Sequence, residues 1–406
     1  MGFTTKALHT KPARDDSYGA MRFPIYQSAA FEFATAEELE AVFRGQKAGH
    51  VYSRSTNPSV EELELKIKAL SGGAGVVATA SGMAALCNTL FALLKSGDNI
   101  LTTNYLFGNT LSFFQTLLED FGVEVRSVDV EDLKALEGCI DARTRLLFCE
   151  SVSNPQLIVP DFKALKAVLK VYNIPLVVDT TMTPWNIFDA KAHGVDIEII
   201  SATKYLSGGG HVLGGLIVDN GTYDWKNFVN LERFYTKFGA NAFIARLRKE
   251  TFRNLGASLS AHSAYLLCLG IETLDLRVGR SCENALNIAK HLVHHEAVMS
   301  IDYPLLSSSL SYANASKQFS GGGAIVTFSV KDKAQAYDFL NRLKIIKRGT
   351  NIQDNKSLAI APYHTIYAEY TDVQKALYKL NEGMVRLSVG IEDLEDLIED
   401  IDQALG

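Results

Sequence analysis

The sequence predicts an α/β protein with a mostly parallel central sheet and a smaller C-terminal α+β domain. Short apolar segments alternate with helical segments from about residue 60 to residue 255, as in parallel sheets covered by helices on both faces. Beyond residue 255 the segments with strand character become fewer, and a long helical stretch covers residues 258–295. We therefore expect an N-terminal arm (1–60), a large domain (61–255) and a C-terminal domain (256–406).

The first elements are predicted from turn and helix signals. Residues 1–60 are expected to be irregular, with "PIYQSAAFEF" as a short extended piece and "SRSTNPS" as a turn. The segment "SVEELELKIKAL" is amphipathic and predicts a helix that ends at Ser71, Gly72 and Gly73. "GVVATA" then leads into a helix from Gly82 to about Lys95.

The remaining elements follow from short apolar runs and helical periodicity. Helices are expected over 110–122 and 162–172. Strands are expected over 99–104, 123–129, 144–151, 174–181, 196–203 and 214–220. In the C-terminal domain, residues 324–330, 333–344 and 384–405 predict a mixture of strands and helices.

Composition excludes several classes of function. The 406 residues carry a net charge of −6 and no basic block, so nucleic-acid binding has little electrostatic support. The N-terminus has no apolar segment typical of a signal peptide, and no run approaches the ~18 apolar residues of a membrane span. Five scattered cysteines without a CxxC pair are typical of a reduced cytoplasm. The segment "HLVHH" at 291–295 is either a metal site or a solvated helix face, and its sparse carboxylates favour the solvated face.

Polar residues follow three predicted strands, at the edge where open parallel sheets bind ligands. Asp179, Asn154 and Lys204 are these residues, while Ser81 and Gly82 begin a helix whose N-terminus favours a phosphate. A carboxylate and a lysine beside a phosphate cradle are what pyridoxal phosphate needs. The lysine amine condenses with the aldehyde of this cofactor, and the carboxylate keeps the pyridine nitrogen protonated.

The loop "SATKYLSGGGHVLGG" adds glycines that permit close backbone approach, and the hydroxyls of Ser201 and Thr203 are expected to bind the phosphate. Each signal also has a simpler interpretation, since a lone lysine can be a solvated strand end and Asp179 a helix cap. The glycine run lacks the GK[ST] of a nucleotide-binding loop. "FSGGGAIVTF" is expected to be a turn entering a strand.

Nearly the whole chain resembles the Cys/Met-metabolism family of pyridoxal-phosphate enzymes, and within it the O-acetylhomoserine sulfhydrylases. The resemblance rests on "YSRSTNP", "ASGMAA", "ESVSNP", "VVDTT", "SATKYLSGGG", "GIETLDLR", "NIQDNKSLAIAP" and "VRLSVG". It implies fold type I, the aspartate-aminotransferase-like fold. It also implies a homotetramer built from active dimers and the cofactor pyridoxal 5'-phosphate (PLP). The cysteine pattern places the expected protein in the cytoplasm, and no metal is expected.

The resemblance also implies roles for individual residues. Lys204 would hold the cofactor and move protons, Asp179 would pair with the pyridinium nitrogen, and Phe107 would stack on the ring. Arg386 would bind the substrate carboxylate, a task suited to its planar fork of donors, beside Ser357. The remaining cofactor contacts would come from Ser81, Gly82, Met83, Asn154, Thr181, Ser201 and Thr203, and from Tyr52 and Arg54 of a neighbouring subunit.

The chain departs from the family pattern around the expected leaving group. Phe107 replaces a tyrosine and has no proton to donate, Thr180 replaces an asparagine, Gly209 replaces a histidine, and Tyr367 stands where a histidine is usual. Asn109 replaces the cysteine that many methionine γ-lyases carry.

The expected reaction is γ-replacement of acetate by sulfide in O-acetylhomoserine, which gives homocysteine for methionine biosynthesis. A methionine or cystathionine γ-lyase, a cystathionine γ-synthase and a non-enzymatic binding protein are the alternatives. The sequence leaves open the acyl group and the form in which sulfur arrives.

Overall fold

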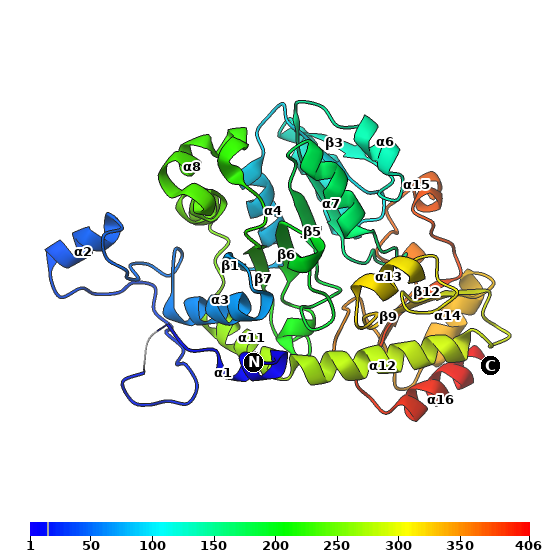
Figure 1. Ribbon diagram of the computed structural model, residues 1–406. Helices are drawn as coiled ribbons and strands as arrows, with labels where there is room; N and C mark the ends of the chain where they lie inside the picture. The colour runs from blue at the N-terminus through cyan, green and yellow to red at the C-terminus, as the bar shows by residue number, and fades with distance from the viewer. Residues whose placement is uncertain (14–15) are drawn as a thin grey trace.

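A computed structural model describes residues 1–13 and 16–406 of the chain. Within these residues, the fold is built around two β-sheets, one of seven strands and one of five, with helices packed against them (Figure 1). The large sheet has the order β1-β7-β6-β5-β4-β2-β3, and the small sheet has the order β10-β11-β12-β9-β8. The strands of the large sheet are β1 (Gly75–Thr79), β2 (Asn99–Thr102), β3 (Glu124–Ser127), β4 (Thr144–Glu150), β5 (Leu176–Asp179), β6 (Ile197–Ser201) and β7 (Gly215–Asp219). Those of the small sheet are β8 (Ser300–Asp302), β9 (Ile325–Ser329), β10 (Lys347–Arg348), β11 (Leu358–Ile360) and β12 (Met384–Ser388).

The large sheet is parallel except for β7, which runs antiparallel to both of its neighbours. Side chains alternate between its faces, so that Val177 and Val178 of β5 enter different cores. The inner strands β5, β6 and β7 are almost fully buried, as expected of a sheet covered by helices on both faces, whereas the edge strand β3 is partly exposed. The predicted α/β fold with a mostly parallel sheet and a smaller second domain is therefore confirmed, while the exact domain boundaries stay a prediction.

Helices cover both faces of the large sheet. On one face α4 packs against β1, β6 and β7, together with α5 and α9. On the other face α3 and α11 cover the β1–β7 end, and α7 covers the β4–β5 end. The helices of this part are α3 (Pro58–Ser71), α4 (Gly82–Leu93), α5 (Gly108–Phe113), α6 (Leu133–Gly138), α7 (Phe162–Val171), α8 (Glu232–Phe238), α9 (Ala242–Arg246), α10 (Phe252–Leu255) and α11 (Ala261–Glu272).

Single turns connect these elements. α5 continues as the π-helical η1 (Phe114–Leu118), and α9 reaches α10 through the π-helical η7 (Leu247–Thr251). The 3-10 turns are η2 (Lys191–His193), η3 (Tyr205–Ser207), η4 (Trp225–Asn227), η5 (Val229–Leu231), η6 (Gly239–Asn241) and η8 (Pro362–His364). Of these, η3 matters most for the site, because it begins directly after Lys204.

The helical stretch predicted over 258–295 consists of two helices. α11 ends at Glu272, and α12 (Leu274–Leu292) follows after the single residue Thr273 and runs toward the small sheet (Figure 1). There α12 packs with α14 and α16 around the core of the second domain. The helices of this domain are α13 (Tyr312–Gln318), α14 (Lys333–Arg342), α15 (Asp372–Leu377) and α16 (Leu394–Leu405).

The first 60 residues are more ordered than the sequence indicated. They contain α1 (Phe3–His9) and α2 (Ala36–Phe43), while "PIYQSAAFEF" forms only one isolated bridge, between Ala30 and Tyr52. The prediction of an irregular arm missed both helices, and part of it, residues 14–15, lies outside the described residues. α2 stands away from the body at the end of an extended segment (Figure 1).

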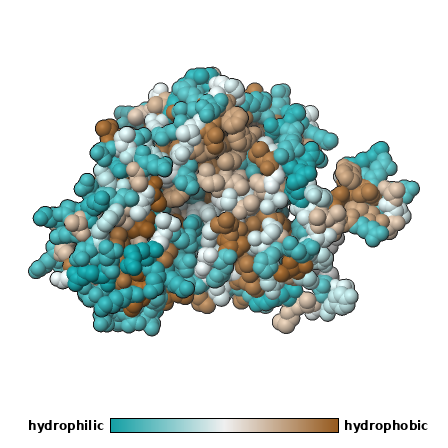
Figure 2. Space-filling model, turned by 180° about the vertical axis from the view of Figure 1, so that it is seen from behind, coloured by the Kyte–Doolittle hydropathy of each residue, from teal (hydrophilic) through white to brown (hydrophobic). Residues whose placement is uncertain are grey.

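The projecting arm presents apolar side chains. Figure 2 shows a hydrophobic patch on it, and Phe43 of α2 is 73% exposed. No helix in the described parts of the chain has the length and apolar character needed to cross a bilayer.

Candidate active site

A cavity of about 300 Å³ lies at the carboxyl ends of β4, β5 and β6, between the start of α4 and strand β12. The register of the parallel strands brings residues that are distant in sequence to this one edge of the sheet. The predicted site residues that line the cavity are Ser81, Gly82, Met83, Phe107, Asn154, Asp179, Thr181, Ser201, Thr203, Lys204 and Arg386.

Lys204 follows β6 and reaches into the cavity. Its Nζ donates a hydrogen bond to Oδ1 of Asn351 at 2.6 Å. Burial, and then the positive charge of Arg386, lower the pKa of the Lys204 amine to about 8, while Asp354 opposes this shift. The amine is therefore partly neutral, and so nucleophilic, near neutral pH.

Asp179 is the last residue of β5 and accepts a hydrogen bond at Oδ1 from the backbone N–H of Thr181 at 2.9 Å. Burial raises the pKa of the Asp179 carboxyl. No basic side chain of residues 1–13 and 16–406 forms an ion pair with it. A buried carboxylate in this state fits a cationic ligand group, such as the protonated nitrogen of a pyridine ring.

The N-terminus of α4 forms a cradle for an anion. Ser81 caps the helix, its Oγ accepting a hydrogen bond from the backbone N–H of Ala84 at 3.1 Å. Gly82 packs so tightly on β6 that a Cβ there would lie 2.8 Å from Cβ of Ser201. Free backbone N–H groups at a helix start, next to the hydroxyl of Ser201, fit a phosphate. Thr203 also lines the cavity, and its hydroxyl donates to the backbone oxygen of Gly214 at 3.3 Å and accepts from the backbone N–H of the same glycine at 3.1 Å.

Arg386 enters the cavity from β12 of the small sheet and is only 1% exposed. Its Nη1 donates to Oδ1 of Asn154 at 3.2 Å, and its Nη2 donates to the backbone oxygen of Thr350 at 3.0 Å. Its Nε has no partner among the described residues. Burial lowers the pKa of the guanidinium to about 10. A buried cation with an open donor fits the carboxylate of a substrate.

Phe107 is the N-cap residue of α5 and lines the cavity. Its backbone N–H donates to Oε1 of Glu150 at 2.6 Å. Glu150 ends β4, directly opposite Asp179 of β5 in the strand register. Burial, and next the charge of Asp179, hold the pKa of the Glu150 carboxyl well above its ordinary value.

The sequence interpretation missed Glu150 and Asn351. Glu150 ends its strand as Asp179 ends the next one, and the same rule applied to "LLFCES" would have found it. Asn351 lies outside any strand and meets Lys204 only through the packing of the two domains.

Three predicted residues lie outside this cavity within one chain. Nη1 of Arg54 donates to the backbone oxygen of Arg253 at 2.6 Å, and Tyr52 lies near it on the arm. Ser357 is buried, where its hydroxyl donates to Glu392 Oε2 and accepts from the backbone N–H of Gly390, both at 2.8 Å. The structure thus does not bring Ser357 to the cavity, because these two partners occupy it.

Two of the residues that depart from the family pattern, Tyr367 and Thr180, have clear hydrogen-bond partners. The hydroxyl of Tyr367 is buried within 3.2 Å of the Leu106 oxygen and 3.1 Å of the Asn154 oxygen, both of the backbone. Thr180 donates to Oε2 of Glu198 at 2.9 Å. Burial raises the pKa of Tyr367. Neither hydroxyl faces the cavity.

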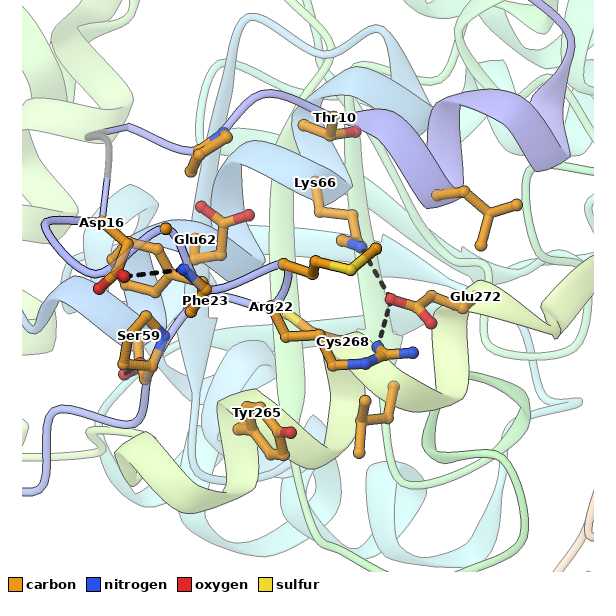
Figure 3. A pocket seen from close by; sticks show the side chains of 17 residues that line it. Thr10, Asp16, Arg22, Phe23, Ser59, Glu62, Lys66, Tyr265, Cys268 and Glu272 are labelled. Atoms are coloured by element: carbon orange, nitrogen blue, oxygen red, sulfur yellow. Dashed lines mark hydrogen bonds and ion pairs between the residues drawn. The ribbon is translucent and has the colours of Figure 1, made fainter.

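A second cavity, of about 380 Å³, lies between the N-terminal segment, α3 and α11 (Figure 3). Arg22 and Glu272 form an ion pair of 2.7 Å in it, and Lys66 lies 3.9 Å from the same carboxylate oxygen. None of the predicted site residues lines this cavity.

In the "HLVHH" segment, Nε2 of His291 lies 2.7 Å from Oδ1 of Asp402 in α16, a carboxylate that sequence spacing did not place there. Within the described ranges, no group of three His, Cys, Asp or Glu side chains is arranged to hold a metal ion.

The amine, the unpaired carboxylate and the anion cradle together fit pyridoxal phosphate, so the fold and the cavity define the class as a PLP-dependent enzyme of fold type I. The model of one family, Cys/Met metabolism PLP-dependent enzyme, matches residues 4–406. The chain belongs to this family.

Relatives within the family have different activities. An L-methionine gamma-lyase of Pseudomonas putida is 37% identical, over 100% of this chain and 97% of the relative. A solved structure of an O-acetylhomoserine sulfhydrylase of Wolinella succinogenes is 44% identical with a TM-score of 0.82. A structure from Campylobacter jejuni, which contains N'-pyridoxyl-lysine-5'-monophosphate, is 31% identical with a TM-score of 0.95. Each of these two structures and this chain cover one another completely.

Proposed function

We propose that the protein is an O-acetylhomoserine sulfhydrylase, which replaces the acetate of O-acetylhomoserine by sulfide and releases homocysteine. The observation that carries this proposal is the apolar ring of Phe107 in the cavity. The similarity to the Wolinella succinogenes sulfhydrylase over the whole chain supports it.

The side chain of Phe107 affects which leaving group the site can release, because it has no proton to donate. Acetate departs as a stable carboxylate and needs no proton, whereas a thiolate is a stronger base and departs more easily when an acid protonates it. Among the described residues, the titratable groups that line the cavity are those of Lys204, Arg386, Asp179 and Glu150. The carboxyls of Asp179 and Glu150 lie side by side at the ends of β5 and β4. A site with no phenol at position 107 therefore favours an acyl ester over a thioether as substrate.

The cofactor would be held by groups from three sides. Lys204 would bind it covalently, Asp179 would pair with its ring nitrogen, and Phe107 would stack on the ring. Thr181 orients Asp179 through its backbone N–H. The phosphate contacts would come from Ser81, Gly82, Met83, Ser201 and Thr203. When bound, PLP supplies a sink for the electrons released at Cα of the substrate.

The substrate would be oriented by Arg386 and deprotonated by Lys204. The open Nε of Arg386 receives the α-carboxylate, and Asn154 fixes the plane of the guanidinium through Nη1. An amine with a pKa near 8 can remove the Cα proton and return it at working pH.

The active unit would be a dimer, and two dimers would form a tetramer in the cytoplasm. Tyr52 and Arg54 lie on the arm and outside the cavity of their own chain, which supports their service to a neighbouring subunit. The exposed apolar side chains of α2 support burial of the arm against a second copy. The five cysteines are free, as in reduced proteins.

A γ-lyase is the second candidate, because the relative from Pseudomonas putida carries that activity in its name. It shares every cofactor contact, so only products separate the two reactions. A lyase releases 2-oxobutyrate and ammonia whether or not sulfide is present.

The test incubates the purified protein with O-acetyl-L-homoserine, with and without sulfide, and quantifies homocysteine and 2-oxobutyrate. Homocysteine that forms only with sulfide supports the proposal, and the Lys204→Ala variant as control should form none. Keto acid that forms regardless of sulfide would establish the lyase. Parallel incubations with O-succinyl-L-homoserine and with methanethiol would define the acyl group and the sulfur donor.

A further inference from the structure

One asparagine lies between the two cations of the site. Oδ1 of Asn351 accepts from Nζ of Lys204 at 2.6 Å, and the backbone oxygen of Asn351 lies 3.4 Å from Nη2 of Arg386. Its neighbour Thr350 accepts from the same Nη2 at 3.0 Å. The lysine that carries out the chemistry and the arginine that binds the carboxylate are thus joined by one short segment of chain.

The orientation of the Asn351 amide is fixed by Asp354. Nδ2 of Asn351 donates to Oδ2 of Asp354 at 3.3 Å. A carboxylate accepts and does not donate, so the amide nitrogen must face Asp354 and the amide oxygen must face Lys204. The pair therefore presents an acceptor, and not a donor, to the lysine amine.

The glycine loop that follows Lys204 packs directly on this pair. A Cβ on Gly210, whose φ is +67°, would lie 2.5 Å from Oδ2 of Asp354 and 3.1 Å from Nδ2 of Asn351. Asn355 donates from its side chain to the backbone oxygen of Gly208 and so joins the two loops. The glycines thus allow the 351–355 segment to reach Lys204.

From these contacts we infer that Asn351 is a positioning residue that holds the Lys204 amine whenever this amine is not covalently bound, with Asp354 orienting the amide of Asn351. This inference rests on the proposed role of Lys204 as the base that exchanges protons with the substrate. A freed lysine side chain has four rotatable bonds and would otherwise lose its place beside Cα. Because Asn351 also accepts from Arg386, the amine is held in a fixed relation to the bound carboxylate.

The test uses the full chain freed of its cofactor and measures the pH at which Lys204 is half labelled by acetic anhydride, with the labelled peptide quantified by mass spectrometry. The charged groups that face this amine are Arg386 from β12, Asp354 from the adjoining loop, and the carboxyls of Asp179 and Glu150 across the cavity. The parent midpoint is expected near pH 8.

Asn351→Ala removes an acceptor that stabilises the ammonium form, so its midpoint should fall by about 0.5–1 pH unit. Asn351→Asp keeps an oxygen acceptor and adds a negative charge, so its midpoint should rise by about 1 unit. Asn355→Ala loosens the same loop without touching Lys204, and its midpoint should stay at the parent value. In the loaded enzyme, Asn351→Ala should lower kcat about 10- to 100-fold while changing KM little.

An unchanged midpoint in Asn351→Ala, or an equal fall in Asn355→Ala, would overturn the inference. Either result concerns the lysine alone, since labelling involves neither O-acetylhomoserine nor sulfide. Failure of the proposed reaction would instead appear in the product assay, with the labelling midpoints unaffected.

Discussion

At the scale of single residues, Lys204 and Arg386 place two like charges in one buried cavity. Burial and this repulsion both disfavour the protonated lysine, and the pKa of Lys204 falls from 10.5 to about 8. The charge of Asp354, which does not line the cavity, partly opposes this lowering of the Lys204 pKa. The result is an amine that is available as a nucleophile and base without an additional base beside it.

The lowered pKa predicts how capture of the cofactor depends on pH. Only the neutral amine condenses with an aldehyde, so the capture rate of cofactor-free protein should rise with pH and reach half its maximum near pH 8. Arg386→Leu removes the positive charge that lowers the pKa, and its curve should move to higher pH. Stopped-flow absorbance of added PLP measures both curves. A curve for Arg386→Leu that stays in place or moves to lower pH would contradict the electrostatic account.

Phe107 predicts the selectivity between elimination and replacement. In Phe107→Tyr a phenol returns to the cavity and can protonate a departing thiolate. The formation of 2-oxobutyrate from methionine or homocysteine should increase by about 10-fold or more, since general acids contribute ~10²–10⁴-fold. The homocysteine yield from O-acetylhomoserine should change far less. Equal changes in both reactions would remove the leaving-group argument.

Residues at strand ends could be predicted from sequence, while residues placed by tertiary contacts could not. Lys204 and Asp179 follow apolar runs, and the rule that ligands bind at the carboxyl edge located them. Asn351 escaped because its position depends on how the small domain packs on the large one. Ser357 was expected in the cavity from the family resemblance, but Glu392 and Gly390 satisfy its hydroxyl elsewhere.

At the scale of elements, the contact between β7 and the start of α4 sets the shape of the phosphate cradle. A Cβ on Gly215 would lie 1.9 Å from the backbone oxygen of Ser81, so this strand passes too close to the helix start for any side chain at this position. The helices themselves were predictable from periodicity. The break between α11 and α12 at Thr273 was not predictable from periodicity, because it depends on a tertiary contact. α11 packs against η3 so closely that a Cβ on Gly270 would lie 2.3 Å from the backbone oxygen of Leu206.

Gly215→Ala should therefore displace β7 from α4. We expect a loss of about 1–3 kcal/mol in the free energy of unfolding and a weaker Kd for PLP, because the clash is with backbone that cannot turn aside. Gly138→Ala is the matched control, since Gly138 is exposed in α6 and a Cβ there meets nothing within 4 Å. Thermal unfolding with and without PLP measures both effects. Equal stability of the two variants would show that the cradle tolerates the extra carbon.

At the scale of the whole molecule, the predicted site residues of one chain fall into two groups, because some lie in the cavity and others lie on the arm outside it. Lys204 and Arg386 face the cavity of their own chain, while Tyr52 and Arg54 lie outside it. The sequence predicted the overall α/β architecture, while the bounds of the arm and its contact with a neighbouring subunit stay predictions. The interpretation missed α2 although Thr35 and Glu38 form a capping pattern at its start, and it missed α1 because a seven-residue helix without a side-chain cap gives a weak signal.

The proposed sharing of sites between subunits predicts complementation between two inactive variants. Lys204→Ala lacks the lysine of its own site, and Arg54→Ala lacks the arginine that it lends. Each variant alone should have little activity, but subunit exchange should restore about a quarter of the parent activity, because half of the dimers would be hybrids with one intact site. Mixing after mild dissociation, followed by the homocysteine assay, tests this. Mixtures no more active than their components would mean that Arg54 serves no neighbouring site.

The antiparallel strand β7 also determines when the site can come into existence as the chain is synthesised. Among the described strands, β1 pairs only with β7, which is separated from it by well over one hundred residues of sequence. A growing polypeptide that has emerged only as far as Lys204 contains every other cofactor-binding residue of the large domain, yet its first strand has no place in the sheet. β1, which leads into the start of α4, is joined to the rest of the sheet only when residues 215–219 enter between β1 and β6. The sheet edge that carries the candidate site is therefore complete only after most of the large domain has been synthesised.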